Sequence, residues 1–518
     1  MTLARMLAAS SLRQPNTTAI VDGERRLSYG DWQAEVRRLA GGLRGLGLGP
    51  GDHLVVVLSN RMETASLYWA CQTLGVVFTP FNWRATAEEI TYVLADAEAR
   101  VVAYEDRSAA AVLPAVAEVA LPEERLIRVE TEGDGLAFTD IAAAEPYDGL
   151  LRDDDHATSL MLYTSGTTGR PKGVPRSYAA ERTAALGCLA QLHYRHGEVS
   201  LGVMPLFHTM GVRSLLMSVF LNGTFVCMPA YETEAALGLI ESERISALFL
   251  VPTMFHDIVH HPKLFETDLG SVNNIAYAGM SMTTALVQSC AATFPGALFS
   301  NFYGSSEIYT FAIRNNLTEN PGSAGLPGMG QTLRVVRADP DERVGPDDMV
   351  PVGETGEIIA SMYALDAFKG YWKRPDADEK AIRKGWYFTG DIGRFDENGE
   401  IYVLGRVDDM IISGGENIYA EEVEDVLAKS PYVLGVAVIG LPDDRWGERV
   451  AAFIEPASEA ASPESLDRFC LDSGLARFKR PQAYAFVDAI PRSASGKLLR
   501  RQLRTGEYEL LTDYVNTV

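Results

Sequence analysis

The stretch that decides the fold is YTSGTTGRPKG at Tyr163–Gly173, which directly follows the apolar run Ser159–Leu162. Its three glycines allow backbone conformations that other residues rarely adopt, so successive amide groups can point inward at an anion. Four hydroxyl groups add donors, and Lys172 adds a positive charge. The pattern predicts a phosphate-binding loop after a strand. It is not a Walker A loop, because Pro171 stands where that motif needs its second glycine.

Length and composition indicate a globular protein of several domains. At 518 residues the chain is too long for one hydrophobic core, and its hydrophobic and charged fractions of 47% and 22% are usual for globular proteins. The formal charge of −23 argues against general binding to nucleic acid or to an anionic membrane surface. We therefore expect neither partner, and the sequence leaves open whether the chain forms a homodimer.

Neither membrane insertion nor secretion is expected. The longest apolar run, Val433–Leu441, is far shorter than the roughly 18–20 residues that cross a bilayer. The N-terminal segment has Arg5 within its apolar stretch, unlike a secretory signal. The five cysteines are dispersed without a CxxC pair, which favours free thiols in a reducing, cytoplasmic setting.

Hydrophobic patterning predicts layered α/β subdomains with largely parallel sheets. Strand-like runs alternate with helical stretches such as Glu63–Leu74. The predicted strands include His53–Leu58, Val101–Tyr104, Ser246–Val251, Asn274–Tyr277 and Leu298–Tyr303. From about Ser323 a smaller β-rich subdomain is predicted, with strands Leu333–Ala338, Gly356–Ala360 and Glu400–Leu404 and a tight-turn signal at Asn398-Gly399.

A self-contained α+β pattern follows this subdomain. It comprises predicted helices Ala420–Lys429 and Pro463–Leu471 and predicted strands Val433–Ile439, Val450–Glu455 and Ala483–Val487. We therefore predict a large N-terminal domain over residues 1–407, built of α/β subdomains plus the β-rich one, and a small C-terminal domain over residues 408–518.

The loop Tyr163–Gly173 is similar, residue for residue, to the signature of the adenylate-forming superfamily of acyl-CoA synthetases, peptide-synthetase adenylation domains and luciferases. The resemblance runs from about residue 15 to residue 510 and rests on further motifs in the same order. These are YGSSE at Tyr303–Glu307, WYFTGD at Trp386–Asp391, GRVDD at Gly405–Asp409 and PRSASGK at Pro491–Lys497. Ser306 replaces the threonine that is usual in the first of them.

The resemblance implies an ATP site in the N-terminal domain. Glu307 is expected to help hold Mg²⁺, a hard cation that takes carboxylate and phosphate oxygens. Asp391 is expected at the ribose hydroxyls, and Lys497 is expected to bridge the substrate carboxylate and the α-phosphate. The implied catalytic residues are Lys497, His208 and Glu307. The implied nucleotide-binding residues are Thr164, Ser165, Gly166, Thr167, Thr168, Gly169, Lys172, Ala278, Gly279, Tyr303, Gly304, Ser306, Asp391 and Arg406.

The C-terminal segments look most like those of aryl-CoA ligases such as 4-chlorobenzoate-CoA ligase, which implies coenzyme A as cosubstrate. The residues implied for CoA are Arg84, Gly414, Gly415, Glu416, Trp446, Phe478 and Arg480. Gln482 departs from this pattern, because a basic residue is usual there. Asp408 is the implied hinge, about which a mobile C-terminal domain would present Lys497 to the site first and Ser413–Asn417 second.

Such a chain would run two half-reactions. A carboxylate is inert toward a thiol because oxide is an impossible leaving group, so ATP first converts the acid to an acyl-adenylate and pyrophosphate. CoA then displaces AMP and forms the thioester.

Alignment by motif predicts the acyl pocket and, from it, the substrate. The predicted lining is Leu186, His208, Met210, Phe249, Ala278, Phe302, Tyr309 and Thr310. No acidic residue lies between Phe207 and Asn222, which argues against an amino-acid substrate. The set is apolar and aromatic without a buried basic residue, so malonate-type acids are not expected. The bulk of Phe249 and Tyr309 favours a short, flat acid such as a benzoate or furoate.

Three alternatives remain beside a ligase for a small aromatic acid. The first is a ligase for medium- or long-chain fatty acids, since side-chain identity does not fix pocket depth. The second is a nucleotide-binding sensor without activity, which the set Lys172, Glu307, Asp391 and Lys497 disfavours. The third is transfer to a carrier-protein thiol, which Trp446, Phe478 and Arg480 disfavour because they would contact the CoA nucleotide.

Overall fold

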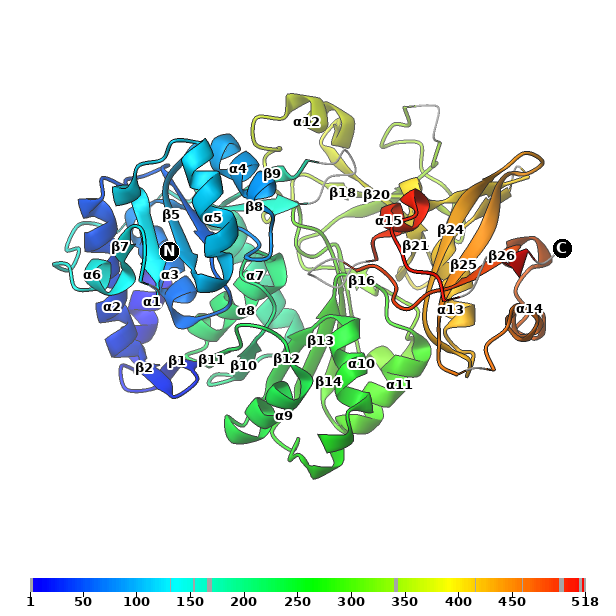
Figure 1. Cartoon of the computed structure of the whole chain (residues 1–518), viewed down its shortest axis with the longest axis horizontal. Coiled ribbons are helices and arrows are strands. Elements are labelled where there is room, and N and C mark those ends of the chain that lie inside the picture. Colours follow the sequence, from blue (N-terminus) through cyan, green and yellow to red (C-terminus); the bar gives the residue numbers. More distant parts are fainter. Residues whose placement is uncertain are drawn as a thin grey trace.

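The computed structural model describes residues 3–130, 132–151, 154–164, 170–339, 343–414, 416–458, 460–492, 498–511 and 515–516. A large α/β body contains two central sheets and a third, smaller β-rich part, and a smaller α+β body follows at the C-terminal end (Figure 1). The predicted mixed α/β class, with a large N-terminal and a smaller C-terminal part, is confirmed.

The first central sheet has seven strands in the order β7-β6-β5-β3-β4-β8-β9. All neighbouring strands are parallel except the last pair, β8 and β9. Their bounds are β3 His53–Val57, β4 Val77–Pro80, β5 Ala99–Glu105, β6 Leu126–Val129, β7 Leu136–Ala137, β8 Thr158–Thr164 and β9 Lys172–Ser177. The antiparallel pairing of Thr164 with Lys172 holds together the two ends of the predicted phosphate-binding loop.

The second central sheet has nine strands in the order β16-β15-β14-β13-β12-β10-β11-β1-β2. Its bounds are β1 Thr18–Asp22, β2 Arg25–Ser28, β10 Val199–Gly202, β11 Thr224–Cys227, β12 Ala247–Leu250, β13 Asn274–Ala278, β14 Leu298–Tyr303, β15 Ala312–Asn315 and β16 Leu326–Pro327. Because β12, β13 and β14 are parallel neighbours, their carboxyl ends meet at one edge of the sheet. Ligands bind at such edges in open α/β sheets.

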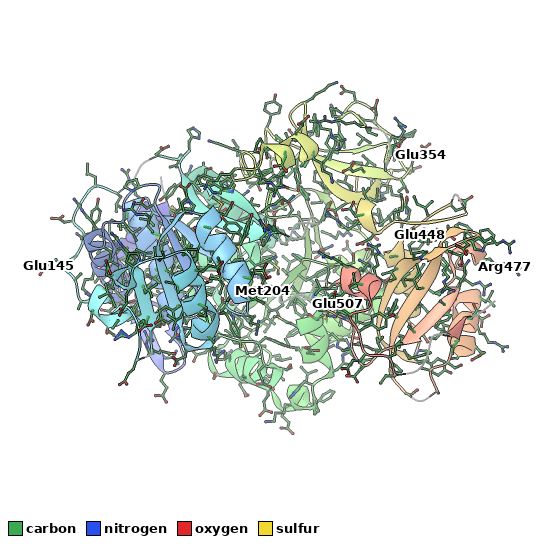
Figure 2. The ribbon with its side chains drawn as sticks, turned by 45° about the horizontal axis from the view of Figure 1, so that its top comes forward. Glu145, Met204, Glu354, Glu448, Arg477 and Glu507 are labelled. Carbon is green, nitrogen blue, oxygen red and sulfur yellow. The ribbon has the colours of Figure 1, made fainter. Side chains whose placement is uncertain are left out.

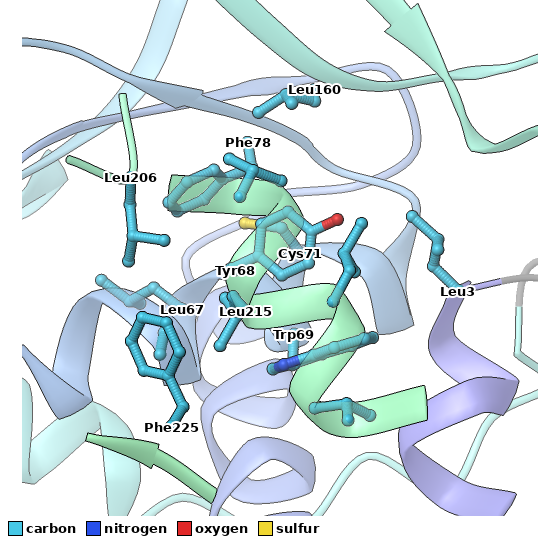
Figure 3. Packing of buried hydrophobic residues seen from close by; sticks show 14 of the residues in the cluster. Leu3, Leu67, Tyr68, Trp69, Cys71, Phe78, Leu160, Leu206, Leu215 and Phe225 are labelled. Atoms are coloured by element: carbon cyan, nitrogen blue, oxygen red, sulfur yellow. The ribbon is translucent and has the colours of Figure 1, made fainter. Parts of the chain in front are cut away.

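Two helices, α3 (Met62–Leu74) and α8 (Thr209–Phe220), lie in the shared core between these sheets. Every residue of both helices is buried, so neither has the polar face of a surface helix. Figure 3 shows Trp69 of α3 and Leu215 of α8 within one apolar cluster, which also contains Phe78 of the first sheet and Phe225 of the second. The two sheets therefore fold as one unit around a common core.

Further helices pack around the two central sheets. Their bounds are α1 Leu3–Arg13, α2 Tyr29–Gly45, α4 Ala87–Asp96, α5 Asp106–Glu118, α6 Phe138–Ala142, α7 Tyr178–Leu192, α9 Thr233–Ser242, α10 Pro252–His260 and α11 Thr284–Thr293. Helices α4 and α5 pack on the first sheet in a separate apolar cluster, and α9, α10 and α11 pack on the second sheet in another. Helices α1, α2, α6 and α7 contribute instead to the shared core with α3 and α8.

The predicted β-rich subdomain is a five-stranded sheet. Its strands are β17 Leu333–Val336, β18 Gly356–Ser361, β19 Ile382–Arg383, β20 Trp386–Phe395 and β21 Ile401–Arg406, with helix α12 at Pro375–Ala381. The predicted turn at Asn398-Gly399 joins β20 to β21, and Gly399 has a φ of +79° there. This pairing sets Asp391 directly opposite Arg406.

The C-terminal body has its own six-stranded sheet. Its elements are β22 Ile411–Ser413, β23 Glu416–Ile418, α13 Ala420–Leu427, β24 Val433–Asp443, β25 Gly447–Pro456, α14 Pro463–Asp472, β26 Ala483–Phe486, α15 Arg500–Thr505 and β27 Val515–Asn516. Strand β24 extends four residues beyond its predicted end, because Gly440–Asp443 pair with the start of β25. Sheet membership changes between β21 and β22, next to residue 407, where the domain boundary stays a prediction.

All five cysteines are buried and unbridged. Among the described residues, no helix combines the length and the apolar character needed to cross a bilayer.

One fully buried arginine connects the parts of the large body. Arg176 of β9 forms an ion pair with Glu181 of α7, with 2.9 Å between Nε and Oε1. Its Nη1 donates to the backbone carbonyls of Glu307, at 2.8 Å, and of Asp366, at 2.6 Å. The guanidinium carbon also lies 3.9 Å from the centre of the Tyr309 ring. Arg176 thus ties the first sheet to the loop after β14 of the second sheet and to the loop after β18 of the sheet in the β-rich subdomain.

We predict that Arg176→Met destabilises the large body by about 3–5 kcal/mol, because Glu181 is left as a buried, uncompensated acid. Urea unfolding followed by tryptophan fluorescence measures the change. The double variant Arg176→Met/Glu181→Met should recover part of the loss, and Arg100→Met, at an exposed position on β5, should change stability by less than about 0.5 kcal/mol. A double variant less stable than the single one would contradict this account.

Candidate active site

The candidate site lies at the carboxyl ends of β13 and β14. Ala278 pairs with Phe302 in register, so the predicted residues that follow, Gly279 and Tyr303, lie at the same edge. Gly279 has a φ of +93°, which favours glycine. A side chain at Gly304 would collide with the backbone carbonyl of Tyr309. Both glycines therefore permit a close backbone approach at the position where the sequence predicts the nucleotide.

A tyrosine and an arginine hold the predicted ribose ligand Asp391. Tyr303 Oη donates to Oδ2 of Asp391 at 2.6 Å, and Arg406 Nη1 donates to Oδ1 at 2.6 Å. Burial and the neighbouring Asp391 raise the pKa of Tyr303 well above its ordinary value, so its hydroxyl stays protonated and donates. The structure thus brings three of the predicted nucleotide-binding residues into direct contact. The carboxylate is fixed at the site edge, where diol hydroxyls could donate to it.

A second cluster joins Lys172 and Glu307 through a residue that the sequence analysis missed. Tyr371 Oη donates to Oε1 of Glu307 at 2.7 Å, and Lys172 Nζ lies 4.2 Å from the centre of the Tyr371 ring. Burial lowers the pKa of Lys172, and the nearby Glu307 carboxylate opposes that shift. No local pattern marks Tyr371, because its hydrogen-bond partner is 64 residues away in the chain.

This second cluster could take part in binding Mg²⁺ together with phosphates. The described part of the chain contains no group of three or more His, Cys, Asp or Glu side chains that could hold a metal alone. Mg²⁺ is usually bound through one or two carboxylates together with substrate phosphates, so the single carboxylate of Glu307 fits that role. Glu307 is only 7% exposed, and Ser305 Oγ accepts from its backbone N–H at 3.2 Å.

Some predicted site residues fall outside the described residues. They are Ser165, Gly166, Thr167, Thr168, Gly169, Gly415 and Lys497. Ser306 follows Ser305 in the loop after β14, and Thr164 ends β8.

Most of the predicted acyl-pocket residues lie together. Met210, Phe249, Ala278, Phe302 and Tyr309 belong to one buried apolar cluster, in which the Phe249 and Phe302 ring centres are 5.6 Å apart. Thr310 is also buried. His208 caps helix α8, with its Nδ1 accepting from the Met210 backbone N–H at 3.3 Å. Leu186, on α7, differs from the others because its side chain is 43% exposed.

The prediction that no basic residue is buried at the pocket is wrong. Arg213 of α8 is only 1% exposed, and its guanidinium carbon lies 5.1 Å from the ring centre of Phe249 and 5.3 Å from that of Phe302. The sequence does not reveal this burial, because a single arginine in an otherwise apolar helix is expected to lie on the face toward solvent. Here α8 has no polar face, so the arginine is enclosed.

The residues predicted for CoA are in two separate places. Arg84 lies over the Trp83 ring at 4.0 Å, and both line a cavity of about 270 Å³ with Arg492 of the C-terminal body and Asp257 of α10. Gly414 contacts Trp446 instead, through a 2.8 Å hydrogen bond from the Gly414 N–H to the Trp446 carbonyl. Arg84 is therefore near the segment that leads to Lys497.

Phe478 and Arg480 also lie in the C-terminal body, between α14 and β26. Figure 2 shows Arg477, the neighbour of Phe478, at the outer end of the molecule, far from Met204 of the large body. Arg480 already forms an ion pair with Asp467. Glu416 is exposed at the start of β23, and Trp446 is 41% exposed. In this arrangement the six described CoA residues do not form one site.

The predicted hinge residue Asp408 lies in a short 3₁₀ turn, Val407–Asp409. The next residue, Asp409, forms ion pairs with Arg500 at 3.3 Å and Arg504 at 3.4 Å. A side chain at Gly405, just before the turn, would collide with the carboxylate of Glu421 on α13. The segment around Asp408 is therefore held from the C-terminal side by α13 and α15.

Comparison with known proteins assigns the chain to a family. The model of the AMP-binding enzymes matches residues 7–372, and that of the AMP-binding enzyme C-terminal domain matches residues 422–497. A feruloyl-CoA synthase of Amycolatopsis sp. is 34% identical over 495 residues, which cover 95% of this chain and 96% of the relative. A 4-chlorobenzoate–CoA ligase of Arthrobacter sp. is 31% identical over 508 residues, covering 97% and 95%.

Two further matches bear on substrate and fold. A long-chain-fatty-acid–CoA ligase of Mycobacterium tuberculosis is 31% identical over 483 residues, covering 92% of this chain and 93% of the relative. The o-succinylbenzoate-CoA synthetase of Bacillus subtilis, solved with its acyl-adenylate intermediate, is 28% identical, has a TM-score of 0.83, and is matched over 96% of this chain and 97% of its own. The predicted resemblance is confirmed: this chain belongs to the family of AMP-binding, adenylate-forming enzymes.

Proposed function

We propose that this AMP-forming acyl-CoA ligase, which uses ATP, a carboxylic acid and CoA, acts on a small aromatic acid of the benzoate, hydroxybenzoate, halobenzoate or furoate type. The observation that carries the proposal is the position of the aromatic cluster Phe249, Phe302 and Tyr309. It lies at the same sheet edge as the Tyr303–Asp391 pair, and Tyr309 also contacts Arg176, which donates to the backbone carbonyl of Glu307. Acid and nucleotide would therefore meet at one edge.

The residues support a two-step mechanism. Asp391 would accept the ribose hydroxyls with Arg406 beside it, and Lys172 would face the phosphates, so that the α-phosphorus is presented to the acid. Mg²⁺ held by Glu307 would draw charge from the phosphates. The carboxylate oxygen then forms a bond to the α-phosphorus while pyrophosphate leaves. In the second step the CoA sulfur forms a bond to the acyl carbon while AMP leaves.

The substrate class rests on the pocket and on the relatives. Two relatives are named as ligases for aromatic acids, feruloyl and 4-chlorobenzoyl, and the buried lining of the pocket is largely aromatic. The second candidate is a fatty acid, which the mycobacterial relative favours.

A panel of benzoate, 4-chlorobenzoate, ferulate, hexanoate and palmitate, each with ATP and CoA, separates the aromatic acid from the fatty acid as substrate. We expect at least one of the three aromatic acids, benzoate, 4-chlorobenzoate or ferulate, to yield AMP and pyrophosphate at least tenfold faster than palmitate; the reverse order would favour the fatty acid.

We also propose that the C-terminal domain, residues 408–518, rotates about Asp408 between the two steps. Arg492, five residues before Lys497, lines a cavity with Arg84 of the large body, whereas Gly414 and Trp446 contact each other away from it. This supports an arrangement in which the Lys497 segment serves the first step.

Two substitutions should therefore block different steps. Lys497→Ala should reduce adenylate formation by at least 100-fold while supplied acyl-adenylate still reacts with CoA, because the ammonium would stabilise charge only at phosphorus. Gly415→Leu should do the reverse, since a side chain would block close approach of pantetheine. Pyrophosphate release and thioester formation from synthetic acyl-adenylate measure the steps separately. Loss of the same step in both variants would contradict the proposed rotation.

Tyr371 should position Glu307 for Mg²⁺. Tyr371→Phe keeps the ring beside Lys172 but removes the hydrogen bond to the carboxylate, which is worth about 1.5–3 kcal/mol for a charged acceptor. We expect kcat/KM for ATP to fall about tenfold or more and half-saturation to need more Mg²⁺, with the KM for CoA unchanged. Tyr371→Leu should lose more, because the ring beside Lys172 is also removed. An unchanged Mg²⁺ dependence in Tyr371→Phe would contradict this role.

A further inference from the structure

Arg213 is a cation in a place where the fold alone gives no reason for one. It lies in the first half of α8, in the helix whose every residue is buried between the two central sheets. Burying a guanidinium costs several kcal/mol unless it is paired with an acid and fully hydrogen-bonded. A methionine or leucine would fill this position without that cost.

The surroundings compensate this charge only in part. Nη1 of Arg213 donates to Oγ1 of Thr310 at 3.0 Å and to the carbonyl of Tyr309 at 3.4 Å, and three aromatic rings lie around the guanidinium. Its Nε has no hydrogen-bond partner. Glu181, on which Arg213 acts electrostatically, is already paired with Arg176 at 2.9 Å. Asp366, on which Arg213 also acts electrostatically, is already hydrogen-bonded, because it accepts from Gln331 at 2.6 Å.

The position of Arg213 matches the predicted acyl pocket and not the nucleotide clusters. The three rings around it, Phe249, Phe302 and Tyr309, are all predicted pocket residues, with ring centres 5.1, 5.3 and 5.5 Å from its guanidinium carbon. On α8 it stands three residues after Met210, so the two share a helix face. A donor within an aromatic pocket attracts an oxygen acceptor on a flat ligand.

We propose that Arg213 is a specificity-determining residue of the acyl pocket, and that it selects acids carrying a second, hydrogen-bond-accepting oxygen remote from the reacting carboxylate. Within the aromatic class on which this inference rests, these are ring-hydroxylated, alkoxylated or carboxylated acids. A site built to bond such an oxygen rejects the analogue without it, because a buried donor is left unpaired. Carboxylated acids, which the sequence analysis disfavoured, become substrates to test.

Matched acids test the proposal on the native chain. 3- and 4-hydroxybenzoate are compared with 3- and 4-methylbenzoate, whose methyl group has nearly the same size as the hydroxyl; terephthalate is added as the anionic case. We expect at least one hydroxylated or carboxylated acid to exceed its methyl counterpart at least tenfold in kcat/KM for pyrophosphate release. No preference for any oxygen-bearing acid would overturn the proposal.

Substitution then assigns the preference to Arg213. Arg213→Met should lower the ratio of kcat/KM for the oxygen-bearing acid to kcat/KM for its methyl counterpart at least tenfold. Arg213→Lys, which keeps the charge, should retain part of the native preference. Because both acids are measured on one preparation, a general loss of folded enzyme cancels in the ratio. An unchanged ratio in a folded Arg213→Met would overturn the proposal. If that variant does not fold, the proposal is tested by the native preference and by its partial loss in Arg213→Lys.

Failure of the proposed function gives a different result. If fatty acids but no aromatic acids yield AMP, the aromatic class is wrong, and the same comparison is made with 10-hydroxydecanoate and undecanoate. A tenfold preference for the hydroxylated chain that Arg213→Met removes would still support the role of Arg213. Equal use of the two chains would overturn it.

Discussion

The structure depends on the buried contact between Arg176 and Glu181. The guanidinium comes from β9 of the first sheet, its ion-pair partner comes from α7, and its two carbonyl acceptors belong to Glu307 and Asp366. A buried ion pair of this kind contributes little net stability, since desolvation offsets most of the attraction. It does fix geometry, because removing any one partner leaves a buried group unpaired. The backbone of Glu307 is thereby placed relative to β9, the strand that begins with Lys172.

Local patterning predicted most of the fold. Many strands of the two central sheets are short apolar runs, and β3, β5, β12, β13 and β14 all formed where the sequence indicated. The tip of β24, Gly440–Asp443, was missed because glycine and proline in it indicate a turn, whereas pairing with β25 keeps it in the strand. The two central sheets share a core through α3 and α8, which no strand pattern reveals.

The candidate site was predicted only where a motif marks it. Tyr303, Asp391 and Arg406 belong to recognisable motifs, and the structure brings them into contact. Tyr371 and Arg213 belong to none, and their importance comes from partners far away in the chain. A sequence signal did exist for Arg213, since it is the only charged residue of α8, in TMGVRSLLMSVF. Reading it needed the knowledge that both faces of that helix are covered.

The site draws on all three sheets of the large body, and this has a consequence for synthesis on the ribosome. Chains grow from the N-terminus, and domains begin to fold as they emerge. A nascent chain that has released only its first 320 residues already contains Lys172, Tyr303 and Glu307. It still lacks Tyr371, Asp391, Arg406 and Lys497, so the residues proposed for ribose, for orienting the metal ligand and for the α-phosphate emerge later. The emerging polypeptide would therefore be unable to consume ATP wastefully before its final quarter has been translated.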